Sequence, residues 1–253
     1  MESKLTSARL EALRRLDTCT VSNAIEAFSV RLRNEGFADS SISCIFPALP
    51  AMAGYAVTCR IRCSGPPPKG HSYLDRTDWW DHVQTIPVPR VVVIQDIDHY
   101  PGLGSFLGEV HVSILKALKC VGAVTNGAVR DLAAVEPTGF NLFARNVAVS
   151  HAYVHFVDFG GPVEIGGLRI SPGDLIHDDR HGVLSVPKQI AAKIPGVAAK
   201  ALERERRIIE LCRSADFSLE RLNRLIKELL KERGSEISPP DSPNSSKPNS
   251  QII

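Results

Sequence analysis

A strand-like run, a helix-like segment and a second strand-like run follow one another between residues 90 and 125, and this order constrains the fold more than any other feature of the chain. Residues 90–95 are an apolar run typical of a strand covered on both faces. Apolar side chains at helical spacing predict a helix over residues 107–119, and residues 122–125 again suit a strand. This order predicts a right-handed crossover between two parallel strands.

Neighbouring segments extend this pattern along the chain. Further strands are predicted at residues 55–61 and 140–144, and a hairpin closed by two glycines at residues 163–170. An opening helix is predicted over residues 5–16. A second helix is expected to start at Ser22 or Asn23, because either side chain can cap the first amides. The predicted fold class is therefore α/β.

Composition divides the 253 residues into three parts. Residues 1–195 form the predicted α/β domain. Residues 196–233 repeat Leu and Ile among Lys, Arg and Glu, which predicts two amphipathic helices separated near residues 214–218. The mixed charges there are interpreted as a solvated face rather than a basic surface for RNA. Residues 234–253 are rich in Ser, Pro and Asn, so we expect a disordered tail.

Charge and hydropathy exclude two classes of partner. The chain has 30 Lys and Arg residues against 28 Asp and Glu, and a net charge of +2 selects for neither nucleic acid nor an anionic membrane surface. The longest aliphatic run, residues 91–94, is far shorter than the roughly 18 apolar residues of a membrane-spanning helix. The first residues lack the pattern of a signal peptide, so we expect a cytoplasmic protein.

The six cysteines are interpreted as reduced thiols, because none belongs to a two-residue-spaced pair of the kind that binds zinc. Cys59 and Cys63 are four residues apart in an alternating run, which would place both sulfur atoms with Ile61 on one face of a strand. We expect these two side chains to pack in the core.

The most informative polar pattern is Gly108-Glu109, followed by twenty residues and then Arg130-Asp131. A crossover returns both pairs to the edge of the sheet where α/β proteins bind ligands. Arginine matches a substrate carboxylate, and aspartate suits a divalent cation. The amides at the start of the helix suit an anion as well, and they belong to Glu109, Val110 and His111. The alternative is a structural ion pair at a helix start, which the residues alone leave open.

The histidines near these segments can each have a functional or a structural role. His111 either contacts substrate or is a buried helix histidine with a backbone partner, and the second is commoner. His151 and His155 are four residues apart, but residues 152–154 are predicted as strand, which does not present two histidines as paired helix ligands.

A second candidate metal cluster lies at residues 177–181. His177 and His181 flank the carboxylates of Asp178 and Asp179. A solvated turn between two strands is the default interpretation, because nothing in this spacing forces the four side chains to converge.

Five stretches of the chain, in a fixed order, resemble the RraA-like family. They are residues 54–58, 108–109, 122–132, 139–145 and 166–187. The family includes aldolases acting on 4-hydroxy-4-methyl-2-oxoglutarate and 4-carboxy-4-hydroxy-2-oxoadipate, together with the regulator of ribonuclease activity A. The resemblance spans residues 15–190. It implies a swivelling β/β/α-type domain and a homotrimer or homohexamer with sites between subunits.

The resemblance also implies roles at individual positions. Asp131 would hold a divalent metal, Mg²⁺ or Mn²⁺, directly or through its waters. Arg130 would pair with the carboxylate or the developing enolate oxygen of a small 2-oxo acid substrate, and Glu109 would fix a metal-bound or proton-shuttling water. The residues that would bind the substrate are Gly108, Glu109, Val110, His111 and Arg130.

The implied activity is that of a class II-type, metal-dependent lyase. Cleavage of a carbon–carbon bond would leave a pyruvate enolate, stabilised where its charge develops. Oxaloacetate decarboxylation passes through the same enolate, so a decarboxylase side activity is implied. Two alternatives stay open. One is a relative acting on a different substrate, and the other is a non-catalytic protein-binding regulator of RNA-degrading complexes.

Some positions depart from the family pattern. Asn23 and Asn126 stand where aspartate is usual, and His181 stands where an acidic residue is common. The stretch over residues 71–82, with two adjacent tryptophans, is longer than the family pattern. It is interpreted as a lid or as a surface loop with buried tryptophans, and burial is favoured because these side chains carry large apolar area.

Overall fold

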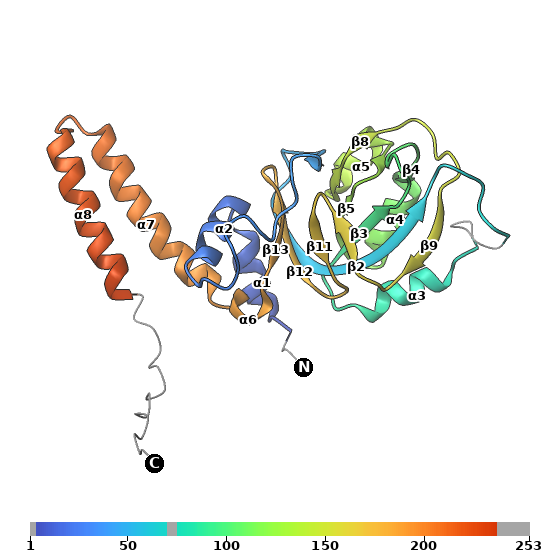
Figure 1. Cartoon of the computed structure of the whole chain (residues 1–253), viewed down its shortest axis with the longest axis horizontal. Coiled ribbons are helices and arrows are strands. Elements are labelled where there is room, and N and C mark those ends of the chain that lie inside the picture. The colour runs from blue at the N-terminus through green and yellow to red at the C-terminus, as the bar shows by residue number, and fades with distance from the viewer. Residues whose placement is uncertain (1–3, 70–74, 237–253) are drawn as a thin grey trace, which may run out of the picture. The chain divides into compact units, whose positions relative to one another are not determined.

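The computed structural model describes residues 4–69 and 75–236. They form two compact units, one ending at Ala199 and the other starting at Lys200 (Figure 1). The predicted tail lies almost entirely outside the described residues. The boundaries inferred from composition, after residues 195 and 233, stay predictions.

Eight strands of the first unit form one mixed sheet (Figure 1). Its order is β1 (Ser43–Cys44), β7 (Asn141–Ala144), β5 (Cys120–Thr125), β3 (Arg90–Asp96), β2 (Met52–Arg62), β12 (Leu175–Asp179) and β13 (Gly182–Val186), with β9 (His155–Phe159) also paired to β2. Strands β2, β3, β5 and β7 run parallel to their neighbours in this series. Helix α4 (Glu109–Ala117) lies between β3 and β5 in the chain. The predicted parallel strand–helix–strand arrangement is therefore confirmed.

A separate three-stranded parallel ribbon positions the polar pairs. It consists of β4 (Ser105–Leu107), β6 (Ala128–Val129) and β8 (Asn146–Val147). Leu107 lies opposite Val129, and the backbone N–H of Arg130 donates to the Leu107 carbonyl at 2.9 Å. Because the strands are parallel, Gly108 and Arg130 leave the ribbon at the same end.

The predicted hairpin is also confirmed. It consists of β10 (Val163–Ile165) and β11 (Leu168–Ile170), paired antiparallel across two glycines. Both glycines have positive φ, 54° and 73°. Glycine adopts such backbone angles at little cost, so the pair suits a two-residue turn.

The remaining helices of the first unit are α1 (Ser7–Arg14), α2 (Thr18–Glu26), α3 (Asp78–Thr85), α5 (Leu132–Val135), the 3₁₀ helix η1 (Glu136–Thr138) and α6 (Lys188–Ala191). The predicted start of the second helix at Ser22 or Asn23 is wrong, because both residues lie inside α2. The cap is Asp17, whose Oδ1 accepts the N–H of Thr20 at 2.8 Å. Asp17 lies five residues before Ser22 and accepts one of the free N–H groups at the helix start, so the helix begins before Ser22.

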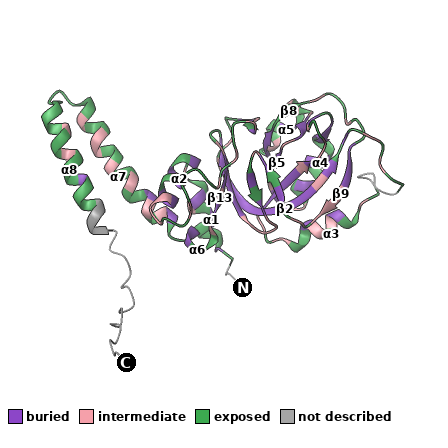
Figure 2. Ribbon diagram, viewed as in Figure 1, coloured by how far each residue is buried: buried purple, intermediate pink, exposed green. Residues whose placement is uncertain are grey.

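Apolar clusters cover both faces of the sheet, and Figure 2 shows its strands as largely buried. Alternate residues of β3 belong to different clusters, which confirms the prediction of a strand covered on both faces. Cys59 and Cys63 are buried in the same cluster as Ile61, so their predicted core packing is confirmed. A third cluster packs α1, α2 and α6 on β12 and β13.

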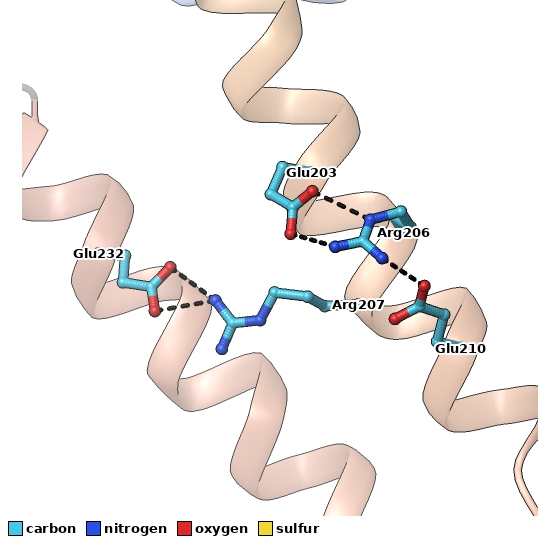
Figure 3. Close-up of polar contacts among 5 residues, drawn as sticks. All are labelled: Glu203, Arg206, Arg207, Glu210 and Glu232. Carbon is cyan, nitrogen blue, oxygen red and sulfur yellow. Dashed lines mark hydrogen bonds and ion pairs between the residues drawn. The ribbon is translucent and has the colours of Figure 1, made fainter.

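The second unit is built from helices. Helix α7 (Ile194–Arg213) runs into it, and α8 (Leu219–Glu236) follows after a break at residues 214–218, where the sequence predicts one. Arg207 on α7 pairs with both carboxylate oxygens of Glu232 on α8 at 3.0 Å (Figure 3). Arg206 pairs with Glu203 and Glu210 along α7. In the described residues, each helix is too short or too polar to cross a bilayer.

Candidate active site

A cavity of about 190 Å³ opens beside the start of α4. Its described lining residues are Trp80, Gly108, Val110, His111, Ile114, Arg130, Asp131 and His151. Five of the six residues predicted for the site, all except Glu109, therefore lie around one cavity. The segments that meet there are α3, α4, the β6–α5 connection and the chain between β8 and β9.

Gly108 is the point where the two polar pairs touch. A Cβ atom at this position would collide with Asp131 Oδ2 and would lie 3.1 Å from the Cγ and Nε atoms of Arg130. The backbone of Gly108 is extended, with φ of −140°. This residue is therefore glycine for lack of space, and not for an unusual backbone angle.

Asp131 holds a left-handed backbone conformation, with φ of 56° and ψ of 37°, at the N-terminus of α5. Such a conformation costs on the order of 1 kcal/mol for a residue other than glycine. Its Oδ2 accepts the backbone N–H of Glu109 at 3.1 Å. One of the amides predicted to bind the substrate carboxylate is thus engaged by Asp131.

The guanidinium of Arg130 lies beside this carboxylate. Its Nε is 3.3 Å from Asp131 Oδ2, and the two side chains are 30% and 38% exposed. The Nε atom itself is buried and has no hydrogen-bond acceptor among the described residues. The arrangement combines an ion pair with a partly exposed guanidinium that an incoming anion can engage.

Glu109 does not line the cavity. It is exposed in the first turn of α4, and its backbone amide, rather than its carboxylate, contacts Asp131. The role predicted for the Glu109 carboxylate, holding a water for proton transfer, stays a prediction.

His111 is 3% exposed and lines the cavity, and both of the roles that the sequence left open for it stay predictions. Its ring centroid lies 4.5 Å from that of Phe106 and 6.3 Å from that of Trp80. Burial lowers the pKa of His111 to about 4, and the neighbouring His151 and Arg130 act in the same direction. The imidazole is therefore uncharged at neutral pH.

Sequence reasoning missed three lining residues, Trp80, Ile114 and His151. His151 lies before β9, and its Nδ1 is 3.0 Å from the Ser105 carbonyl oxygen. The strand predicted between His151 and His155 is wrong, because Ala152 has a φ of 47° and the chain turns there. Ile114 lies one turn after Val110 on α4, so helical spacing could have found it, whereas only the tertiary fold brings Trp80 and His151 to the cavity.

The tryptophan pair occupies two environments. Trp79 is fully buried, with ring centroids 5.3 Å from Phe156 and 5.5 Å from Phe159. Its predicted burial is confirmed. Trp80, the next residue on α3, is half-buried, and it packs against the same cluster and lines the cavity. Buried Trp79 therefore holds α3 in place, and α3 in turn places Trp80 at the cavity.

The second candidate cluster divides between a buried strand, residues 177–179, and an exposed turn that contains His181. His177 and Asp178 are fully buried on β12, and Asp179 is 9% exposed. His177 lies between Thr18 Oγ1, 3.1 Å from Nδ1, and the Leu13 carbonyl, 3.0 Å from Nε2. These residues do not line the cavity. The solvated-turn interpretation is therefore wrong for residues 177–179, because polar residues on an internal strand resemble a loop in sequence, and it agrees with the exposed turn at residues 180–181.

Asn126, one of the departures from the family pattern, has a structural role. Its Oδ1 accepts the backbone N–H of Asp96 at 2.7 Å, and its Nδ2 donates to the Asp96 carbonyl at 2.9 Å. The amide therefore joins the carboxyl ends of β3 and β5. A carboxylate could accept the first of these bonds but could not donate the second.

The residues at the cavity fit a divalent cation with few protein ligands. Asp131 offers a partly exposed carboxylate oxygen, and Mg²⁺ is commonly held by one or two carboxylates, substrate oxygens and several waters. Two other groups of potential ligands occur among the described residues, Asp17 with Cys19 and His181, and Cys63 with Asp96 and Asp98. Neither includes a cavity-lining residue.

Known proteins share both sequence and fold with this chain. The chain is 33% identical over 82 residues to a Halalkalibacterium halodurans protein named "Putative 4-hydroxy-4-methyl-2-oxoglutarate aldolase", which is 32% of this chain and 39% of that protein. The match thus spans less than half of that relative.

Solved structures extend the comparison to nearly the whole fold. An uncharacterized protein from Pseudomonas syringae has a TM-score of 0.68 at 24% identity, covering 88% of this chain and 96% of that one. Streptomyces coelicolor RraAS2, described as an unusual member of the RNase ES inhibitor RraA protein family, has a TM-score of 0.62 at 20% identity, covering 81% and 96%. At these identities the likeness shows the fold alone.

The family comparison covers the cavity as well. The RraA-like model, described as Aldolase/RraA, matches residues 18–185, which is more than half of the chain and includes every cavity-lining residue. The mixed α/β architecture agrees with that match. The chain therefore belongs to the RraA-like family.

Proposed function

We propose that this protein is a divalent-metal-dependent lyase that cleaves or decarboxylates 2-oxo acids through a pyruvate enolate. One observation carries the proposal, namely that Arg130 and Asp131 meet at a single cavity beside the start of α4. The sequence match to a relative with an aldolase name supports it. The rival role, a regulator that binds other proteins, gives no reason for a cationic and an anionic side chain to share a cavity.

Arg130 binds and orients the substrate in this mechanism. Its partly exposed guanidinium pairs with the carboxylate or the 2-oxo oxygen, and the same positive charge stabilises the enolate as the C3–C4 bond breaks. Gly108 leaves the space that brings the substrate near Arg130 and Asp131. A divalent cation held at Asp131 would supply further positive charge for the enolate oxygen.

Proton transfer needs a group that accepts the hydroxyl proton and returns a proton to C3. We assign this to a water held by the Glu109 carboxylate at the exposed start of α4. The apolar cavity walls limit the access of other waters to the enolate. We further propose that the protein is a homotrimer or homohexamer, which sedimentation equilibrium would measure.

Pyruvate release tests the proposal. The full chain is incubated with oxaloacetate or a 4-hydroxy-2-oxo diacid, with Mg²⁺ or Mn²⁺ or with EDTA. We expect release with metal and its loss with EDTA. Arg130→Ala should lower kcat/KM by about 10²–10³, the usual effect of removing one charge-stabilising donor. Arg169→Ala, at an exposed arginine on β11, is the control and should not change it. Absence of release with either metal contradicts the lyase proposal.

A further inference from the structure

We infer that the cavity accepts a 2-oxo acid whose second half is aromatic or apolar, and that Trp80 and His111 are the residues that select it. This inference rests on the proposed lyase function and specifies the substrate class of the same site. It concerns the substituent at C4, beyond the 2-oxo acid group that Arg130 and Asp131 engage.

The charge of the cavity wall favours a substrate with one carboxylate. Among the described lining residues, Arg130 is the single Lys or Arg. Its guanidinium matches one carboxylate, and Asp131 adds a negative charge beside it. A second carboxylate in the cavity would lose hydration without gaining a second Lys or Arg partner among the described lining residues, which is unfavourable.

The remaining wall is shaped for an apolar group. Val110 and Ile114 lie one turn apart on α4, and Trp80 reaches the same cavity from α3. His111 lies between Val110 and Ile114 in the sequence, and the centroid of its ring is 6.3 Å from that of Trp80. Apolar area removed from water in such a site contributes roughly 25 cal/mol per Å², and a ring can also stack on Trp80.

Core contacts hold this wall in place, so it is a preformed surface. Phe106, which is 2% exposed, lies 4.5 Å from His111 between ring centroids. Fully buried Trp79 anchors α3, and with it the backbone of Trp80, against Phe156. Side chains fixed from behind lose little rotamer freedom when a ligand binds, which favours selectivity.

A matched pair of substrates tests the inference. 4-Hydroxy-2-oxo-4-phenylbutanoate and 4-hydroxy-2-oxoglutarate differ only in a phenyl or a carboxylate group at C4. Each loses its hydroxyl proton to a base as the C3–C4 bond breaks, and the bond's electron pair forms the enolate, which is protonated at C3. The products are pyruvate with benzaldehyde or with glyoxylate, and no oxidant or reductant is needed.

We expect kcat/KM with the phenyl substrate to exceed that with the diacid by at least about tenfold, equivalent to 1.4 kcal/mol. Trp80→Ala and His111→Ala should each lower the ratio of the phenyl kcat/KM to the diacid kcat/KM several-fold, and Trp80→Phe should restore most of that ratio. Tyr100→Ala, at an aromatic residue that is 80% exposed, is the control and should change neither value. A diacid that is cleaved as well or better overturns the inference, as do Trp80 variants that affect both substrates equally.

Binding separates this inference from the proposed function. Dissociation constants of phenylpyruvate and oxaloacetate are measured by calorimetry on the same full-length variants. Suppose that neither 4-hydroxy-2-oxo acid is cleaved, but phenylpyruvate binds at least tenfold more tightly than oxaloacetate and Trp80→Ala weakens that binding. The lyase proposal then fails and the inferred ligand class stands. If oxaloacetate binds as tightly, or Trp80→Ala leaves phenylpyruvate binding unchanged, the ligand class fails whatever the activity.

Discussion

Asp131 Oδ2 accepts the backbone N–H of Glu109 at 3.1 Å, so the residue that opens α5 also fixes the first amide of α4. The same carboxylate lies 3.3 Å from Arg130 Nε. Asp131 therefore has two separable properties, a hydrogen-bond acceptor that ties two segments together and a negative charge available to a cation.

Two substitutions separate these properties. Asp131→Asn keeps an oxygen acceptor and removes the charge, so we expect a Tm close to that of the parent protein and a loss of metal-dependent pyruvate release of at least about 10². Asp131→Ala removes both and should cost about 1 kcal/mol of unfolding free energy in addition. Thermal unfolding and the coupled pyruvate assay are the measurements. Full activity in Asp131→Asn contradicts the metal-binding role.

Gly108→Ala should affect activity more than stability. The new Cβ meets the end of the Asp131 side chain and the middle of the Arg130 side chain, and both must move from their positions at the cavity to make room. We expect kcat/KM to fall at least about tenfold, because a misplacement of about 1 Å is enough for such losses. Gly65→Ala is the matched control, since an added Cβ there meets open space. Equal activity in both variants would contradict the close approach.

Asp178 should make the protein less stable as pH rises. Burial raises the pKa of this carboxyl well above its ordinary value, and Asp179 raises it further. The folded state therefore holds a proton that the unfolded state releases above a pH of about 4, so stability falls as pH rises. Asp178→Asn is uncharged at all pH values and should raise Tm by about 3 °C at pH 7. The gain should shrink toward pH 4, and exposed Glu164→Gln should show no such trend.

His177 should have the opposite dependence. Burial lowers its pKa, so below a pH of about 6.5 the unfolded state binds a proton more readily than the folded state. The contribution of His177 to the free energy of unfolding is fully present above that pH and declines as pH falls. Urea unfolding at pH 7 and pH 5 should show a smaller decline for His177→Gln than for the parent protein. If His177→Gln and the parent protein lose the same unfolding free energy between pH 7 and pH 5, His177 is not the group that causes the loss.

Periodicity alone predicts much of this fold. The run in β3 and the helical spacing in α4 are sustained patterns with burial on defined faces, and the structure agrees with them. The turn glycines of the β10–β11 hairpin and the polar break before α8 are local signals that need no tertiary context. The start of α2 was misplaced, since several residues in that segment can cap a helix and only the fold decides which one does.

The candidate site was predictable only where neighbours in sequence share a segment. The predicted crossover placed Gly108-Glu109 and Arg130-Asp131 at one edge of the sheet, and the family resemblance, not the pattern alone, gave Arg130 and Asp131 their predicted roles. Trp80 and His151 come from segments more than 65 residues apart, with no shared pattern to link them. The burial of the polar run ending at Asp179 was not predictable for a related reason, because it depends on the strands packed around that run.

The left-handed backbone at Asp131 also limits which residues this position can carry. Glycine would relax the backbone there, and asparagine would be tolerated, whereas valine or isoleucine would be strongly disfavoured. Glycine would also remove the carboxylate that accepts the N–H of Glu109 and lines the cavity. The conformational penalty at this position therefore accompanies a side chain that both ties α4 to α5 and places a negative charge beside Arg130.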